Sequence, residues 1–188
     1  MKGLTDVRAA ALLIGMLGLT YALPYGLIIA LGVSTSTVPP GHRETFRLEE
    51  SNAPDGKRKQ LELTAPTGWQ RQDRVKPSDV TYTQGNRSVR ISVTEKIGDP
   101  QTAMNRHIRQ AGLSGELLHL GGPEISTGSG FRGQRCAYTT ADSSRHGQCA
   151  MITRDSTMVV LISSDETGKD PLDLHEIVAS IDVKDTTR

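Results

Sequence analysis

The hydrophobic pattern divides the chain into one long apolar segment and a longer region where apolar and polar positions alternate. Residues 9–33 include no charged side chain and are almost wholly apolar. A helix over them would be about 38 Å long, enough to cross a hydrocarbon core of ~30 Å. The segment is longer than the apolar region of a secretory signal peptide, although a cleavage after Gly32 is conceivable. The pattern predicts an uncleaved transmembrane helix over 9–33.

The flanks of this helix predict its orientation. Lys2 and Arg8 precede it, whereas the polar stretch 34–41 that follows is uncharged. A short positive arm stays in the cytoplasm and a long downstream domain is translocated. We therefore expect a cytoplasmic arm (1–8), the helix (9–33), a linker (34–56) and an extracytoplasmic domain (57–188). The turn signals Pro39-Pro40-Gly41 and Pro54-Asp55-Gly56 mark the linker.

Small residues recur on one face of the predicted helix at a spacing of four: Gly18, Ala22, Gly26 and Ala30. Such a stripe lets a second helix approach closely in the lipid bilayer, although small residues are also common in membrane helices for other reasons. Tyr21 and Tyr25 lie near mid-membrane, where their hydroxyl groups need partners. We interpret these six residues as a helix-packing surface for an integral membrane protein complex.

Alternating apolar positions predict mainly strands in the external domain. The predicted strands are 59–65, a hairpin of Val80–Tyr82 with Val89–Val93, 125–131, 135–140, 148–153 and a central buried strand, 158–162. Asp99-Pro100 predicts the start of a helix that ends at Gly112, and Asp170-Pro171 predicts a second helix reaching Ile181. This order predicts an α+β fold, an antiparallel β-sheet with two packed helices.

The opening strand, Leu61-Glu-Leu-Thr-Ala-Pro-Thr-Gly-Trp69, is followed by a hairpin, a long meander and a closing helix, 172–181. In these features, residues 57–185 resemble the PsbP-like class. The resemblance implies a binding or assembly factor without a catalytic centre. Among its members are the extrinsic photosystem II protein and mycobacterial envelope lipoproteins. The preference for Arg over Lys is compatible with an actinobacterial envelope protein.

Cys136 and Cys149 are the only cysteines in the chain. The residues between them are rich in turn formers, and a hairpin centred near 142–143 would place the two cysteines opposite each other. In an oxidising compartment such a pair is bridged. A redox-active pair usually has the spacing Cys-x-x-Cys, so we expect a structural disulfide.

The remaining motifs indicate no catalytic site. The glycine pattern 128–133 matches a dinucleotide fingerprint but lacks the helix that would receive the phosphate, so we expect a sheet bend or bulge there. The histidines lack ligand spacing, so we expect no metal; His107 is expected on the apolar helix face and His146 in a turn. Asp165, Glu166 and Asp170 are expected in a solvated loop. We predict no enzyme and no cofactor.

Beyond His42 the positive and negative residues balance, which argues against nucleic acid as a partner. The sequence therefore predicts a single-pass membrane protein of the cell envelope. Its expected role is a non-enzymatic accessory subunit of a respiratory assembly or an envelope-lipid transporter. The alternative is an extracytoplasmic module that binds an apolar lipid, in a cleft beside the connection 112–123. A hydrolase whose residues meet only in space is a third possibility.

Overall fold

The computed structural model describes residues 35–48, 58–72, 76–166 and 168–186. The chain divides into two units, Met1–Ser34 and Thr35–Arg188. The predicted transmembrane helix and its packing stripe lie outside the described residues. Within the described ranges, no helix has the length and apolar character needed to cross a membrane.

The larger of two sheets has eight strands, every neighbouring pair of which is antiparallel. Its strands, in spatial order, are β1 (Thr35–Thr37), β4 (Gln70–Gln72), β5 (Asp79–Gln84), β6 (Arg87–Thr94), β10 (Thr157–Glu166), β9 (Arg145–Arg154), β8 (Arg132–Thr140) and β7 (Glu116–Ser126). The central strand β10 contains the predicted run 158–162, as its apolar character indicated.

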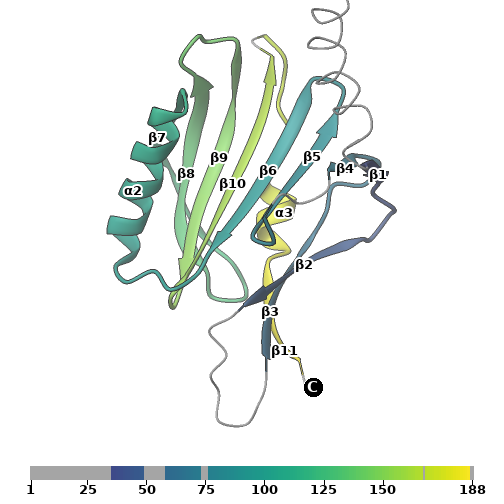
Figure 1. Cartoon of the computed structure of the whole chain (residues 1–188), viewed down its shortest axis with the longest axis vertical. Coiled ribbons are helices and arrows are strands. Elements are labelled where there is room, and N and C mark those ends of the chain that lie inside the picture. The colour runs from purple at the N-terminus through teal and green to yellow at the C-terminus, as the bar shows by residue number, and fades with distance from the viewer. Residues whose placement is uncertain (1–34, 49–57, 73–75, 167, 187–188) are drawn as a thin grey trace, which may run out of the picture. The chain divides into compact units, whose positions relative to one another are not determined.

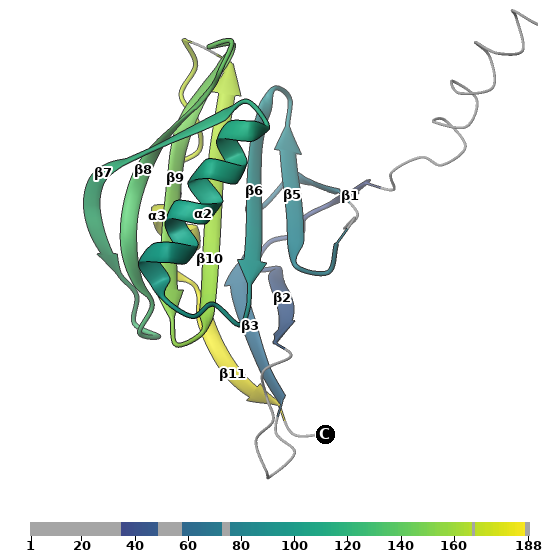
Figure 2. The same ribbon diagram turned by 60° about the vertical axis from the view of Figure 1, so that its left-hand side comes forward.

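The smaller sheet contains β2 (Arg43–Leu48), β3 (Arg58–Thr64) and β11 (Asp182–Thr186), with β3 in the middle. The two helices are α2 (Pro100–Leu113) and α3 (His175–Ala179). Helix α2 lies along one face of the large sheet, and α3 lies on the other face, near the small sheet (Figures 1 and 2). The predicted antiparallel β-sheet domain with two helices is confirmed.

The large sheet is buried on both faces, so the domain has two apolar clusters. Along β10, Val159 and Leu161 belong to the cluster shared with the small sheet and α3. Val160 and Ile162 belong to the cluster under α2. Because successive side chains of a strand point to opposite faces, a strand buried on both sides is apolar without interruption.

Local chemistry explains the elements that the sequence predicted well. The hairpin of β5 and β6 turns at Gly85-Asn86, where Gly85 takes a positive φ of 59° that a non-glycine residue adopts only at a cost. Helix α2 begins after Asp99, whose carboxylate accepts a 2.6 Å hydrogen bond from the backbone N–H of Thr102.

Two predicted boundaries are wrong. Parts of the expected linker 34–56 form β1 and β2, because Phe46 and Leu48 complete the core against the large sheet. The second helix begins at His175 and not after Asp170-Pro171, and Leu174 precedes it without a capping side chain.

The glycine-rich region was also predicted incorrectly. Residues Gly121–Pro123 lie inside β7, at a register shift between Leu120 and Glu124, and the expected strand 125–131 ends at Ser126. A turn follows, in which Gly130 has a φ of 88°, and this turn leads into β8. The glycine pattern 128–133 is therefore followed by a strand and not by a helix, as predicted. The connection 112–123, beside which an apolar cleft was expected, consists of the end of α2 and most of β7.

Candidate functional site

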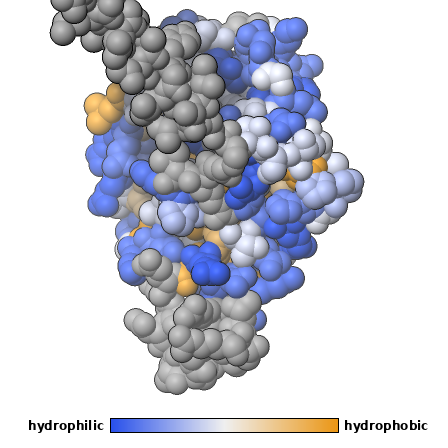
Figure 3. Space-filling view, turned by 45° about the vertical axis from the view of Figure 1, so that its right-hand side comes forward, coloured by the Kyte–Doolittle hydropathy of each residue, from blue (hydrophilic) through white to orange (hydrophobic). Residues whose placement is uncertain are grey.

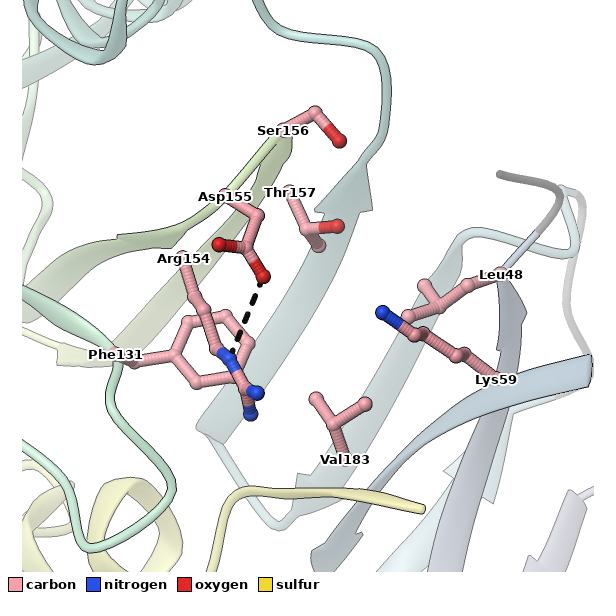
Figure 4. Close-up of a pocket in the computed structure, with 8 residues that line it drawn as sticks. All are labelled: Leu48, Lys59, Phe131, Arg154, Asp155, Ser156, Thr157 and Val183. Atoms are coloured by element: carbon pink, nitrogen blue, oxygen red, sulfur yellow. Dashed lines mark ion pairs between the residues drawn. The ribbon is translucent and has the colours of Figure 1, made fainter. Parts of the chain in front are cut away.

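The candidate site is a cavity of about 290 Å³ at one end of the space between the two sheets. The small sheet supplies Leu48, Lys59 and Val183, and the large sheet supplies the β9–β10 turn, 154–157. Phe131, from the turn before β8, closes the inner wall (Figure 4). We call this space the end cavity.

Strand alternation places cations on the inner walls of the end cavity. Lys59 follows Leu63 and Leu61 along the inward face of β3, both of which are fully buried. In the same way, Arg154 takes the last inward position of β9, after Ile152. In each strand, the inward position next to the buried residues at this end of the sheet is therefore a positive side chain. Neither residue was predicted as part of a site, although the alternating pattern Lys59-x-Leu61-x-Leu63 was a signal for one of them.

Arg154 is held in place by its neighbours. Its Nη1 atom donates a 2.7 Å hydrogen bond to the carbonyl oxygen of Ser129, and its Nε atom lies 3.6 Å from the Asp155 carboxylate. Asp155 has a positive φ of 51° in the β9–β10 turn, a conformation that Asp tolerates better than most residues. The Arg154 guanidinium therefore has a fixed position and a charge that is partly compensated.

Lys59 differs from Arg154 in having no ion pair or side-chain hydrogen bond with any residue that the structure describes. Its amino group points into the end cavity, and the Thr157 hydroxyl group lies on the opposite wall (Figure 4). Thr157 is itself buried, at 8% exposure. With two cations, one carboxylate and apolar walls, the end cavity is suited to bind an anionic group.

A second candidate surface is the outer edge of β7, the last strand of the large sheet. Ala141 N–H donates to the Gly115 carbonyl, so the alternating backbone directs the N–H and C=O groups of Glu116, Leu118 and Leu120 outward. The described part of the chain contains no strand that pairs with this edge.

Two exposed leucines lie at or just before the start of β7 in the sequence. Leu113 at the end of α2 is 90% exposed and Leu117 in β7 is 38% exposed; they are the large hydrophobic side chains that the described residues expose. The face in Figure 3 is mostly polar where it is coloured, and apolar residues appear on it only in small separate patches. A strand whose outer edge is unpaired and has exposed leucines nearby can accept an extended segment of another protein.

The disulfide prediction is confirmed. Cys136 and Cys149 are directly paired across β8 and β9, with an S–S distance of 2.03 Å and a Cα–Cα distance of 4.8 Å. A disulfide is typical of a domain outside the cytoplasm. The bridge belongs to the cluster under α2 and lies on the opposite face of the sheet from the Lys59 side.

The predicted site residues Gly18, Tyr21, Ala22, Tyr25, Gly26 and Ala30 lie outside the described residues. Among the described residues there is no group of three or more His, Cys, Asp or Glu side chains placed to bind a metal. Asp165 was expected in a solvated loop but is buried in β10, where it lies 3.4 Å from Arg87. His146 was expected in a turn but lies in β9.

His107 is half-buried on the face of α2 beside an ion pair. Arg90 donates to Glu116 at 2.6 Å, and the Tyr138 hydroxyl group donates to the same carboxylate at 3.3 Å. Burial, and then the charge of Arg90, lower the pKa of His107, while Glu116 opposes this shift. Burial, followed by the Glu116 charge, raises the pKa of Tyr138. Of these groups, Arg90 lies on β6, Glu116 on β7 and Tyr138 on β8.

Comparison with known proteins found similar folds among solved structures. No protein-family model matches the chain, and no curated protein matches it. The chain is similar to the solution structure of cyanobacterial PsbP from Synechocystis sp. PCC 6803, at 15% identity over 80% of this chain and 98% of that chain, with a TM-score of 0.47. It is also similar to a crystal structure from Bacteroides thetaiotaomicron VPI-5482, at 8% identity over 66% and 45% of the two chains, with a TM-score of 0.40.

Proposed function

We propose that the chain is a non-enzymatic accessory subunit of a larger membrane complex of the cell envelope. The helix 9–33 anchors it with the N-terminus in the cytoplasm, and the external domain docks on a partner through the β7 edge. The carrying observation is that edge: β7 has eleven residues, its outer side pairs with no strand of the described residues, and Leu113 and Leu117 are exposed at or just before its start.

The occupant of the β7 edge is an extended segment of the partner complex. Outward backbone groups of Glu116, Leu118 and Leu120 offer it a row of hydrogen bonds, and the leucines offer apolar contacts. The register shift at 121–123 interrupts the edge, so the paired segment is short. The disulfide supports a location in an oxidising compartment.

In this proposal the anchor also contributes to docking. Enlarging Gly18 to Ile would hold two packed helices apart and remove close van der Waals contacts. Leu19→Ile, off the stripe, is the matched control because lipid accepts either residue. The test is purification of the full chain in mild detergent through a C-terminal tag, followed by identification of the co-purifying proteins.

We expect Gly18→Ile to lose partners at normal protein levels, while Leu19→Ile retains them. Equal co-purification of the two variants would show that the anchor is only a tether. Absence of any co-purifying membrane protein with the unsubstituted chain would contradict the accessory role itself.

A further inference from the structure

We propose that Arg90 is a positioning residue for the β7 edge. Its ion pair with Glu116 holds the first part of β7, residues 116–120, in the extended form that accepts a partner strand. This inference rests on the proposed function, because it names what keeps that same edge ready to bind. The observation that carries it is an ion pair between two strands that are not neighbours in the sheet.

The ion pair joins strands that are separated by three others. The Nη2 atom of Arg90, on β6, donates a 2.6 Å hydrogen bond to the Oε2 atom of Glu116, on β7, although β10, β9 and β8 lie between these strands in the sheet order. At about 4.8 Å for each step between neighbouring strands, β6 and β7 would lie about 19 Å apart in a flat sheet. The two side chains meet because the sheet bends toward the face that α2 covers. The ion pair therefore fastens the last strand of the sheet to its middle.

Both partners of the ion pair have further support. The other carboxylate oxygen of Glu116 accepts a 3.3 Å hydrogen bond from the hydroxyl group of Tyr138, on β8. Arg90 lies directly between Thr81 of β5 and Ile162 of β10, with which it pairs. The side chains of Arg90 and Glu116 are 39% and 21% exposed, so water competes with the contact only in part. The Glu116 carboxylate is thus held from β6 and from β8 at once.

The position of Glu116 in the chain explains why this support matters. Glu116 is the first residue of β7 and follows the end of α2 by three residues, with Gly115 at a φ of 78° between them. Its backbone N–H and C=O groups are directed outward, so they make no bond with β8. The end of an edge strand with one neighbour is a place where a sheet opens locally. The ion pair holds Glu116 by its side chain and leaves the outward backbone groups available to a partner.

A strand that is already ordered binds a partner more tightly than one that must first be ordered. Ordering a segment on binding costs conformational entropy, and this cost reduces the affinity. If the ion pair were removed, the open form of 116–120 would be more populated. The apparent affinity for the partner would then fall in proportion to the fraction of chains whose strand is still closed. Arg90 thus acts on docking without itself contacting the partner.

The first test is hydrogen exchange of the backbone amides over 116–120, measured on the full chain in detergent without a partner. In Arg90→Gln we expect the inward amides of Leu117 and His119, which face β8, to exchange about fivefold faster or more. Arg90→Lys keeps the charge and should retain most of the protection. Arg87→Gln is the matched control, because Arg87 is on the same strand, is also 39% exposed and pairs with Asp165 at 3.4 Å. It should leave exchange over 116–120 unchanged.

A double-mutant cycle separates the ion pair from a general loss of stability. Glu116→Gln should speed exchange as much as Arg90→Gln does, and the double variant should add little, because each change removes the same contact. The second test is co-purification of the membrane partner. We expect Arg90→Gln to retain about a third of the partner or less and Arg87→Gln to retain it fully.

Unchanged exchange in Arg90→Gln would overturn the positioning role, and so would an equal increase in Arg87→Gln or additive effects in the double variant. Faster exchange with an undiminished yield of partner would overturn the effect on docking. If the unsubstituted chain bound no partner, the proposed function would fail by itself. The exchange measurement needs no partner, so it would still decide whether Arg90 holds the strand.

Discussion

A buried carboxylate, Glu44, links the two sheets and offers a quantitative test of the fold. It lies on β2 of the small sheet at 4% exposure. Arg71 of β4 donates to its two oxygens at 2.8 and 3.2 Å, and the Tyr82 hydroxyl group of β5 donates at 2.6 Å. Glu44→Gln would remove the negative charge of this buried ion pair, a change that costs about 3–5 kcal/mol for a buried pair.

Arg71 is 22% exposed at its side chain, so water compensates part of the loss and the lower value, about 3 kcal/mol, applies. For a domain of this size each kcal/mol lowers the melting temperature by about 2–4 °C, so we expect a decrease of about 6–12 °C. The assay is thermal unfolding of the full chain in detergent, followed by circular dichroism.

The matched control is Arg43→Gln, on the neighbouring outward position of β2. Arg43 pairs with Glu62 at 3.1 Å, with 43% of its side chain exposed, and such a surface pair contributes about 0–1 kcal/mol. If Glu44→Gln lowered the melting temperature no more than Arg43→Gln does, the ion pair between the sheets would not hold them together as described.

Two further predictions concern packing and pH. A Cβ atom at Gly147 would lie 1.8 Å from the backbone oxygen of Ser163, whereas at Gly128 it would meet nothing within 4 Å. Gly147→Ala should therefore cost at least about 1–3 kcal/mol in urea unfolding and Gly128→Ala much less; equal costs would contradict the strand spacing. The lowered pKa of His107 means that the unfolded chain binds more protons just below pH 6.5. The free energy of unfolding should rise with pH through that window and rise less in His107→Gln; an unchanged slope would refute this contribution.

The sequence predicted those parts of the fold that depend on local patterns. The Gly85-Asn86 hairpin, the Asp99 cap and the Cys136–Cys149 pairing each follow from turn chemistry, capping or spacing, and the structure confirms them. The uninterrupted run 158–162 likewise indicated a strand buried on both faces.

Other features depend on contacts between distant segments. Residues 43–48 are mostly polar and lie between two turn signals, so they were assigned to a linker. In the structure they form β2, which pairs with β3, and every second residue of β2 is buried. Helix α3 is shorter than predicted. It begins at His175, and the residues between Pro171 and Leu174 are not helical. The end cavity could not be predicted because it forms where five separate stretches of chain meet.

The proposed role depends above all on docking of the external domain through the β7 edge. Its most direct test is the amount of membrane partner that co-purifies with the full chain when Leu117 is changed to Lys. Ser36→Lys, in the exposed strand β1 at the opposite edge of the same sheet, is the control. We predict that Leu117→Lys loses the partner at an unchanged protein level and that Ser36→Lys keeps it. Retention of the partner by Leu117→Lys, at the level of Ser36→Lys, would contradict docking at this edge.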